Sequence, residues 1–111
     1  MRNLVSLHSI LFLCLTLLAV NIQAAERIIS TDGFVTELIF ALEEQDKLLA
    51  IDVTSKVPSG YKQLPNIGYH RNLSAEGLLS LAPGIVIGSE HIGPGNVILA
   101  LKAANIPLLQ L

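Results

Sequence analysis

Tyr69 and Arg71 stand two residues apart in the stretch Gly68 to Gly77, just before a helix start that Ser74 signals. A phenolate oxygen binds ferric iron well, and tyrosine is one of the few side chains that proteins use as an axial haem ligand. A nearby guanidinium favours the phenolate and can also clamp a carboxylate with its planar fork. The pair therefore predicts capture of an anionic iron chelate. Haem, with its propionates, is the leading candidate, with Tyr69 as axial ligand and Arg71 as second contact.

One histidine, His70, lies within this stretch and another, His91, follows later, and histidine is a common metal ligand. If the chain is extended here, positions 69 and 71 face one side and His70 points away, so we expect His70 to be a surface histidine. His91 lies in the Gly/Pro-rich loop 89–95, after an apolar strand. Loops beyond the carboxyl ends of parallel strands are where α/β sheets bind ligands. We expect this loop to come near the ligand without His91 acting as an iron ligand.

Short apolar runs alternate with helical patterns through the chain, and these elements must position the tyrosine and arginine. Apolar residues between positions 34 and 42 recur at helical spacing, and Asp32 is placed to cap that helix. We expect strands at 27–30, 48–52, 85–88 and 106–111, helices at 34–42, 74–81 and 97–104, and loops at 57–67 and 91–96. This alternation implies an α/β fold, a parallel sheet with flanking helices.

Residues 1–24 have the three-part layout of a secretory signal peptide. A short positive start precedes an almost wholly apolar run from Leu4 to Val20, and small residues follow at the expected cut. We expect cleavage after Ala24, with Ala25 as the next choice. The apolar run is close to membrane-spanning length, so a membrane anchor is the alternative.

The single cysteine, Cys14, lies inside this apolar run and is not preceded by the small residues of a lipoprotein signal. The mature part, residues 25–111, therefore has no cysteine for disulfides or thiol chemistry, as suits a protein of the bacterial periplasm. It carries six Lys or Arg against nine Asp or Glu, a formal net charge of −3. No basic block is present for nucleic acid, and no basic amphipathic helix for a membrane surface.

The sequence stops within the last expected strand. Leu108, Leu109 and Leu111 stand there with no covering helix after them, which is typical of an interrupted core. We therefore expect the front portion of a longer protein, with residues 25–111 forming an incomplete N-terminal α/β lobe.

Three stretches resemble a known family: Arg27 to Ser30, Val35 to Leu38, and Leu64 to Gly77. The mature segment resembles the N-terminal lobe of periplasmic haem-binding proteins that serve haem ABC importers. These belong to a cluster of substrate-binding proteins that also handle cobalamin and iron–siderophores. The third stretch is the specific one, and the first two recur across the cluster. Gly84 departs from the aspartate that commonly follows the proline there.

The resemblance implies a function and partners. Family members have two α/β lobes joined by a long helix, and they hold ligand in the cleft between the lobes. Tyr69 and Arg71 would then contact haem, and an inner-membrane ABC permease would receive it, with an outer-membrane haem receptor system as a further partner. Glu76 would dock on permease arginines. A carboxylate in a first helical turn is equally explained by the positive helix end.

Other functions stay open from the sequence. A cobalamin or siderophore carrier is the runner-up, although cobalamin is already ligated and siderophores enclose their iron. An enzyme has little support, because the chain has neither a Gly-x-Ser-x-Gly elbow nor His-Glu-x-x-His, and Asp32, Glu37 and Asp52 are scattered. A truncated, non-functional fragment is the third possibility, because a single lobe leaves one haem face open to water.

Overall fold

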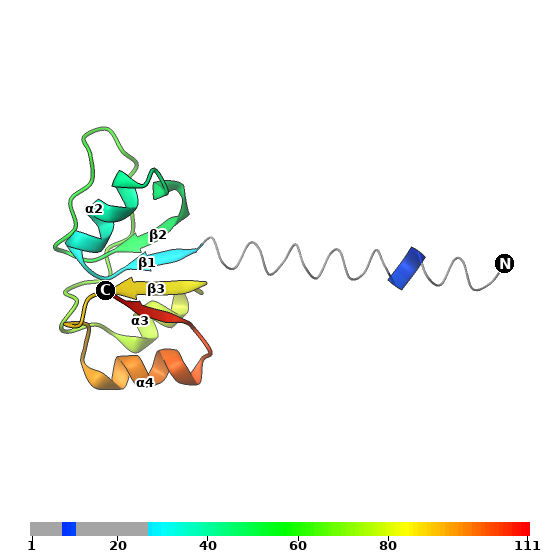
Figure 1. Ribbon diagram of the computed structural model, residues 1–111. Helices are drawn as coiled ribbons and strands as arrows, with labels where there is room; N and C mark the ends of the chain where they lie inside the picture. The colour runs from blue at the N-terminus through cyan, green and yellow to red at the C-terminus, as the bar shows by residue number, and fades with distance from the viewer. Residues whose placement is uncertain (1–7, 11–26) are drawn as a thin grey trace.

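A computed structural model describes residues 8–10 and 27–111 (Figure 1). The elements are β1 (Ile28–Ser30), α2 (Gly33–Ala41), the 3-10 helix η1 (Gln45–Lys47), β2 (Leu48–Ile51), α3 (Ala75–Ser80), β3 (Ile85–Gly88), α4 (Gly95–Ala103) and β4 (Leu108–Gln110). Each expected strand and helix of this part is present, with boundaries that differ by at most two residues. The predicted signal peptide falls almost wholly outside the described residues. Among the described residues, no helix has the length and apolar character needed to cross a membrane.

The four strands form one parallel sheet in the order β2-β1-β3-β4. Ile29 of β1 pairs with Ala50 on one side and Val86 on the other, and all three side chains are fully buried. Parallel strands read as continuous apolar runs because both faces of such a sheet are covered. The predicted α/β fold with a parallel sheet is therefore confirmed.

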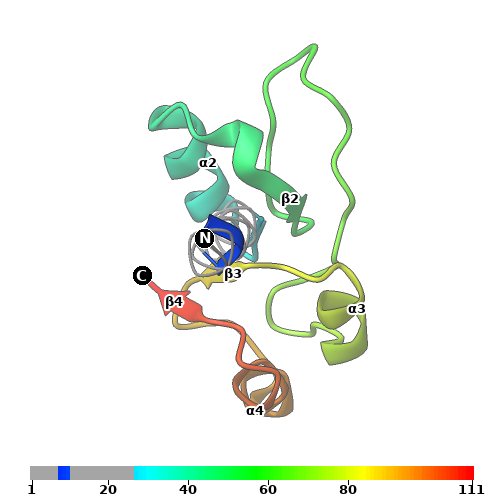
Figure 2. The ribbon, with the colours of Figure 1, turned by 90° about the vertical axis from the view of Figure 1, so that its right-hand side faces the viewer.

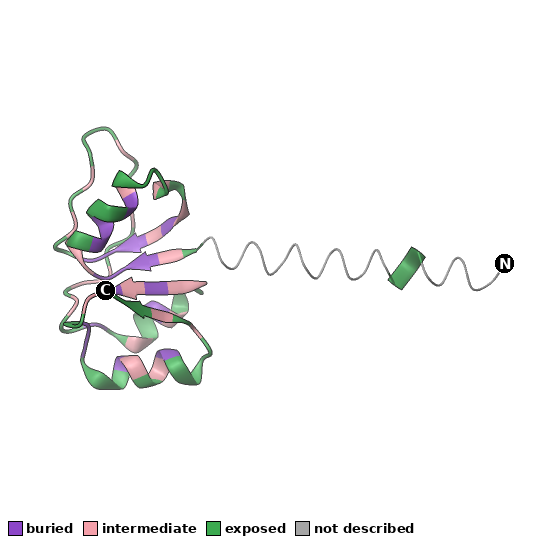
Figure 3. Cartoon of the chain, viewed as in Figure 1, coloured by how far each residue is buried: buried purple, intermediate pink, exposed green. Residues whose placement is uncertain are grey.

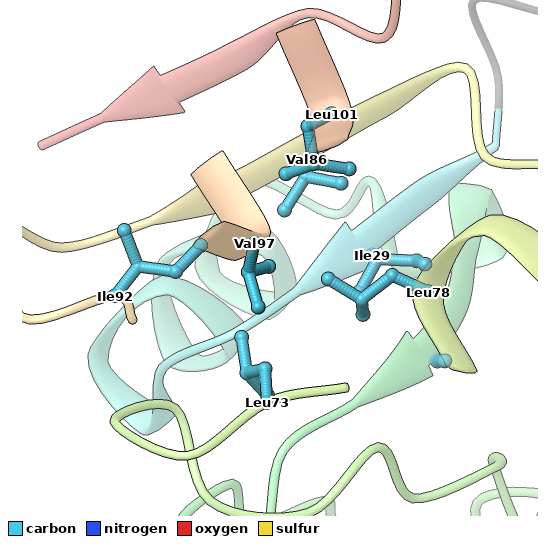
Figure 4. Close-up of a cluster of buried hydrophobic side chains, with 8 residues drawn as sticks. Ile29, Leu73, Leu78, Val86, Ile92, Val97 and Leu101 are labelled. Carbon is cyan, nitrogen blue, oxygen red and sulfur yellow. The ribbon is translucent and has the colours of Figure 1, made fainter. Parts of the chain in front are cut away.

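Helices cover both faces of the sheet. Seen along the strands, α2 lies on one side, and α3 and α4 lie on the other (Figure 2). The larger core cluster lies under α3 and α4, where Ile29 and Val86 of the sheet meet Leu78, Val97 and Leu101 (Figure 4). A smaller cluster under α2 contains Val35, Ile39, Leu48 and Ile51. Buried residues accordingly follow β1 and β2 and the inner sides of the helices (Figure 3).

The face that α2 buries contains only some of its apolar residues. Val35, Thr36 and Ile39 face the sheet, whereas Phe34, Leu38 and Leu42 remain exposed. Helical periodicity alone cannot choose between two adjacent stripes, and here the buried stripe includes a threonine whose hydroxyl is hydrogen-bonded. The predicted helix is present, and only part of its apolar residues face the sheet.

Two caps start helices at the carboxyl side of the sheet. Asp32 caps α2, as predicted, by accepting from the Phe34 N–H at 3.0 Å. Ser74 caps α3 by accepting from the Gly77 N–H at 3.1 Å. Each side-chain oxygen satisfies a backbone donor that has no partner inside the helix. At Gly33 an added Cβ would lie 2.6 Å from the Thr54 carbonyl oxygen, so glycine lets α2 start directly against the segment that follows β2.

Candidate functional site

The stretch that holds Tyr69 crosses the carboxyl ends of the strands, at the left of Figure 1. It arrives there because residues 65–67 run beside β2: the Ile51 N–H donates to the Pro65 carbonyl at 3.0 Å, and the Ile67 N–H donates to the Ile51 carbonyl at 2.9 Å. Gly68 then adopts a φ of 90°, a conformation that L side chains rarely adopt. This glycine turns the chain immediately before Tyr69.

Tyr69 to Asn72 form a turn, not the extended segment that the sequence suggested. The Asn72 N–H donates to the Tyr69 carbonyl at 2.8 Å, the i to i+3 hydrogen bond of a β-turn. The turn is tied on both sides, because the Gly68 carbonyl accepts from Val53 N–H at 2.9 Å and the His70 carbonyl accepts from Gly93 N–H at 2.9 Å. The loops after β2 and β3 therefore fix the backbone around Tyr69.

Tyr69 and Arg71 both lie on the outside of this turn. Tyr69 is 44% exposed, and Arg71 is exposed as well. Within the described part of the chain, neither the phenol nor the guanidinium has a hydrogen-bond or ion-pair partner. The expected bond between Arg71 and a Tyr69 phenolate is thus still a prediction about the liganded state.

His70 is not the surface histidine that we expected. Its side chain is only 12% exposed, and its Nδ1 lies 3.0 Å from Oδ2 of Asp52. Its ring also lies 4.5 Å from the Tyr69 ring, centroid to centroid, at an interplanar angle of 53°. Alternation along a strand does not apply in a turn, and this is the physical reason for the error.

The sequence reading missed the role of Asp52. This carboxylate is fully buried directly after β2 and accepts from the hydroxyls of Thr54 and Ser55 as well as from His70. A buried charge needs such partners to offset the loss of water. One sequence signal for this cluster is an aspartate at a strand end that is followed, two and three positions later, by the hydroxyl residues Thr54 and Ser55. In the sequence alone, Asp52 is one of several scattered acidic residues.

Three other residues singled out in the sequence are exposed. His91 is exposed, and its Nε2 lies 3.8 Å from Oε1 of Glu90, at the long limit of an ion pair. Glu76 is exposed in the first turn of α3, and Glu37 is exposed on α2. The loop that holds His91 touches the Tyr69 turn through Gly93, whose carbonyl accepts from Leu73 N–H at 3.0 Å.

A surface depression of about 260 Å³ is formed elsewhere, between the segment 65–67 and α3. Its lining residues are Pro65, Asn66, Ile67, Gly77, Ser80 and Leu81. Neither Tyr69 nor Arg71 contributes to it, and its lining offers no charged group. It is therefore a different place from the Tyr69 turn.

The chain is similar to known binding proteins. The family model described as periplasmic binding protein matches residues 28–109. The vitamin B12-binding proteins of Yersinia pestis (strain Pestoides F) and Yersinia pseudotuberculosis (serotype O:1b, strain IP 31758) are each 32% identical over 96 residues. The aligned region covers 86% of this chain and 34% of each relative.

Solved structures show the same likeness. The periplasmic heme binding protein HutB of Vibrio cholerae is 47% identical with a TM-score of 0.72, covering 77% of this chain and 33% of that one. The periplasmic heme-binding protein RhuT from Roseiflexus sp. RS-1 is 46% identical with a TM-score of 0.72, at 78% and 33% coverage. The periplasmic vitamin B12 binding protein BtuF of Vibrio cholerae is 28% identical with a TM-score of 0.67, at 78% and 34% coverage.

The family match extends over most of the described residues, from the start of β1 into β4. The chain spans about a third of the length of the relatives it matches. The resemblance predicted from the Tyr69 stretch is confirmed: the chain belongs to the periplasmic binding protein family.

Proposed function

We propose that this chain captures ferric haem in the periplasm, as part of the substrate-binding component of a haem ABC importer. The observation that carries the proposal is the Tyr69–Asn72 turn, which presents an exposed phenol and an exposed guanidinium at the carboxyl edge of a parallel sheet. Ligands of open α/β sheets bind at this edge. Tyr69 would supply the axial oxygen to the iron, and Arg71 would contact a propionate or the phenolate. Such a protein binds and releases its cargo without covalent chemistry.

Haem fits this pair of residues better than cobalamin does. A free phenol can coordinate a haem iron that has an open axial position, whereas the metal of cobalamin is already ligated. The haem-binding structures also share more of their sequence with this chain, at 47% and 46%, than the vitamin B12-binding structure does, at 28%. Cobalamin is still the second candidate, because curated vitamin B12-binding relatives are 32% identical.

Delivery would involve an exposed carboxylate at the start of α3. Glu76 is exposed at the start of α3, eight residues along the chain from the Gly68 turn. An exposed carboxylate there can pair with arginines of an inner-membrane permease. Export would depend on residues 1–24 acting as a signal peptide, and an outer-membrane receptor system would supply the haem.

Replacing Arg71 with alanine is expected to weaken ferric haem binding about tenfold, because a charge-assisted hydrogen bond is lost. Haem dimethyl ester, which has no free propionates, separates the two possible contacts. If Arg71 holds a propionate, the ester binds the unaltered chain more weakly than haem does, and this preference disappears in Arg71→Ala. An unchanged preference in the variant would contradict the propionate contact.

The proposal is tested by titrating the purified chain with ferric haem and, separately, with cyanocobalamin. We expect a saturable change in the haem absorption spectrum and no saturable response to cyanocobalamin. Tight cyanocobalamin binding without haem saturation would favour the second candidate. Failure of a folded chain to bind either ligand would contradict the proposal in favour of a non-functional fragment, with far-ultraviolet circular dichroism as the check of folding.

A further inference from the structure

We propose that His70 is a positioning residue: anchored on the buried Asp52 carboxylate, its imidazole holds the Tyr69 ring in the orientation that presents the phenol to iron. The inference rests on the proposed function, because it concerns how the candidate iron ligand is held. It assigns a role to a histidine that does not touch the iron itself.

The anchor under His70 is a buried polar cluster. Asp52 is 0% exposed, and its Oδ2 lies 3.0 Å from Nδ1 of His70 and 2.8 Å from the Thr54 hydroxyl. The Ser55 hydroxyl donates to Oδ1 at 2.9 Å. A carboxylate only accepts, so Nδ1 of His70 carries the hydrogen. The charge-assisted bond fixes both the tautomer and the plane of the imidazole.

Hydroxyl groups extend this cluster back to β1 and α2. The Ser55 hydroxyl donates its one hydrogen to Asp52. In its 2.6 Å contact with the Thr36 hydroxyl, Ser55 is therefore the acceptor. The Thr36 hydroxyl also lies 2.7 Å from the Ser30 hydroxyl, which in addition donates to the Asp32 carbonyl at 3.1 Å. Hydroxyl contacts thus run without a break from Ser30 through Thr36 and Ser55 to Asp52. Because Ser30 and Thr36 are fully buried, the support beneath His70 belongs to the rigid interior of the lobe.

The Tyr69 side chain depends on His70 in a way that its backbone does not. Hydrogen bonds at Gly68, Tyr69 and His70 fix the main chain, and none of them uses the imidazole. The phenol ring is half-exposed, and within the described residues its one ring partner is His70. Removing the imidazole should therefore leave the turn in place and free the ring. A ligand held in its bound orientation beforehand loses less entropy on binding.

Solution NMR of the ligand-free chain tests the ring contact without haem. The chain has two tyrosines, so ring-labelled tyrosine gives two sets of signals. Tyr61 is the internal control, because its ring packs edge-on against Phe40 at 5.0 Å and its hydroxyl donates to the Gln45 carbonyl. We expect nuclear Overhauser effects between the Tyr69 ring and the His70 imidazole in the unaltered chain. Their absence would overturn the inference directly, with no variant needed.

His70→Gln then removes the ring and keeps a donor for Asp52. We expect the Tyr69 ring signals to move toward those of free tyrosine and to show faster motion, while the Tyr61 signals stay in place. His91→Gln is the matched control, since His91 is an exposed histidine on the neighbouring loop with no ring contact to Tyr69. Tyr69 signals that do not respond to His70→Gln would contradict the inference.

Haem titration of the same variants separates the two proposals. His70→Gln is expected to weaken ferric haem binding about three- to tenfold, the value of an aromatic pair. In a Tyr69→Phe background the same substitution should have no further effect, because the two residues act as one unit. If Tyr69→Phe leaves the haem spectrum unchanged, the ligand assignment fails. The alternative outcome is that Tyr69→Phe abolishes the phenolate absorption while His70→Gln weakens the remaining haem binding by the same factor in both backgrounds. In that case only the positioning role of His70 fails.

Discussion

Replacing Tyr69 with phenylalanine is expected to remove the phenolate-to-iron absorption of the ferric haem complex and to weaken binding roughly 100-fold or more. Loss of a residue that only supports a metal ligand typically costs about 10- to 100-fold in affinity, so loss of the ligand itself belongs at or above the upper end. The fold should survive, because Tyr69 is half-exposed and its turn is held by main-chain hydrogen bonds. Visible absorption during a haem titration, with circular dichroism of the same samples, measures both effects.

Tyr61→Phe is the matched control for this experiment. Tyr61 loses one hydrogen bond, from its hydroxyl to the Gln45 carbonyl at 3.0 Å, and keeps its ring contact with Phe40. We expect about 1 kcal/mol of lost stability and an unchanged haem spectrum. A phenolate band that persists in Tyr69→Phe but disappears in Tyr61→Phe would make Tyr61 the iron ligand and contradict the assignment of Tyr69.

Asp52→Ala is expected to lower the free energy of unfolding by about 2–4 kcal/mol, because buried donors lose their acceptor. The substitution leaves the Ser55 hydroxyl and Nδ1 of His70 without the partner they have at 2.9 and 3.0 Å. It also removes the acceptor that orders Thr54, whose hydroxyl in turn accepts from Gly33 N–H at the start of α2. The effect should appear in urea unfolding curves.

Asp46 provides the control for Asp52. It is exposed in η1, and its replacement by alanine should change stability by no more than about 0.5 kcal/mol. Equal, small effects of the two substitutions would mean that the carboxylate cluster does not support the carboxyl edge of the sheet. The anchoring role assigned to Asp52 would then be wrong as well.

The fold could be predicted from the sequence because its signals are local. Apolar runs such as Ile85 to Gly88 are short and bounded by turn residues, and Asp32 and Ser74 are caps that act within three residues. These patterns do not depend on contacts made elsewhere in the chain. The same holds for the Tyr69 stretch, whose residue types stand next to one another in the sequence.

The surroundings of the site could not be predicted, because they depend on pairings between distant segments. His70 and Asp52 are 18 positions apart, and they meet only because residues 65–67 run beside β2. The burial of Thr36 follows from its hydrogen bonds to Ser30 and Ser55, which no helical period predicts. The wrong expectation for His70 came from assuming an extended chain where the Asn72 N–H closes a turn.

Resonance Raman spectroscopy of the ferric haem complex, prepared with isotopically ring-labelled tyrosine, tests the iron–phenolate bond most directly. We predict tyrosinate and iron–oxygen vibrations that shift with the label, persist in Tyr61→Phe and are absent from Tyr69→Phe. A haem complex whose spectrum contains no tyrosine-sensitive vibration would contradict the assignment of Tyr69 as the ligand, and with it the proposed capture of haem by this turn.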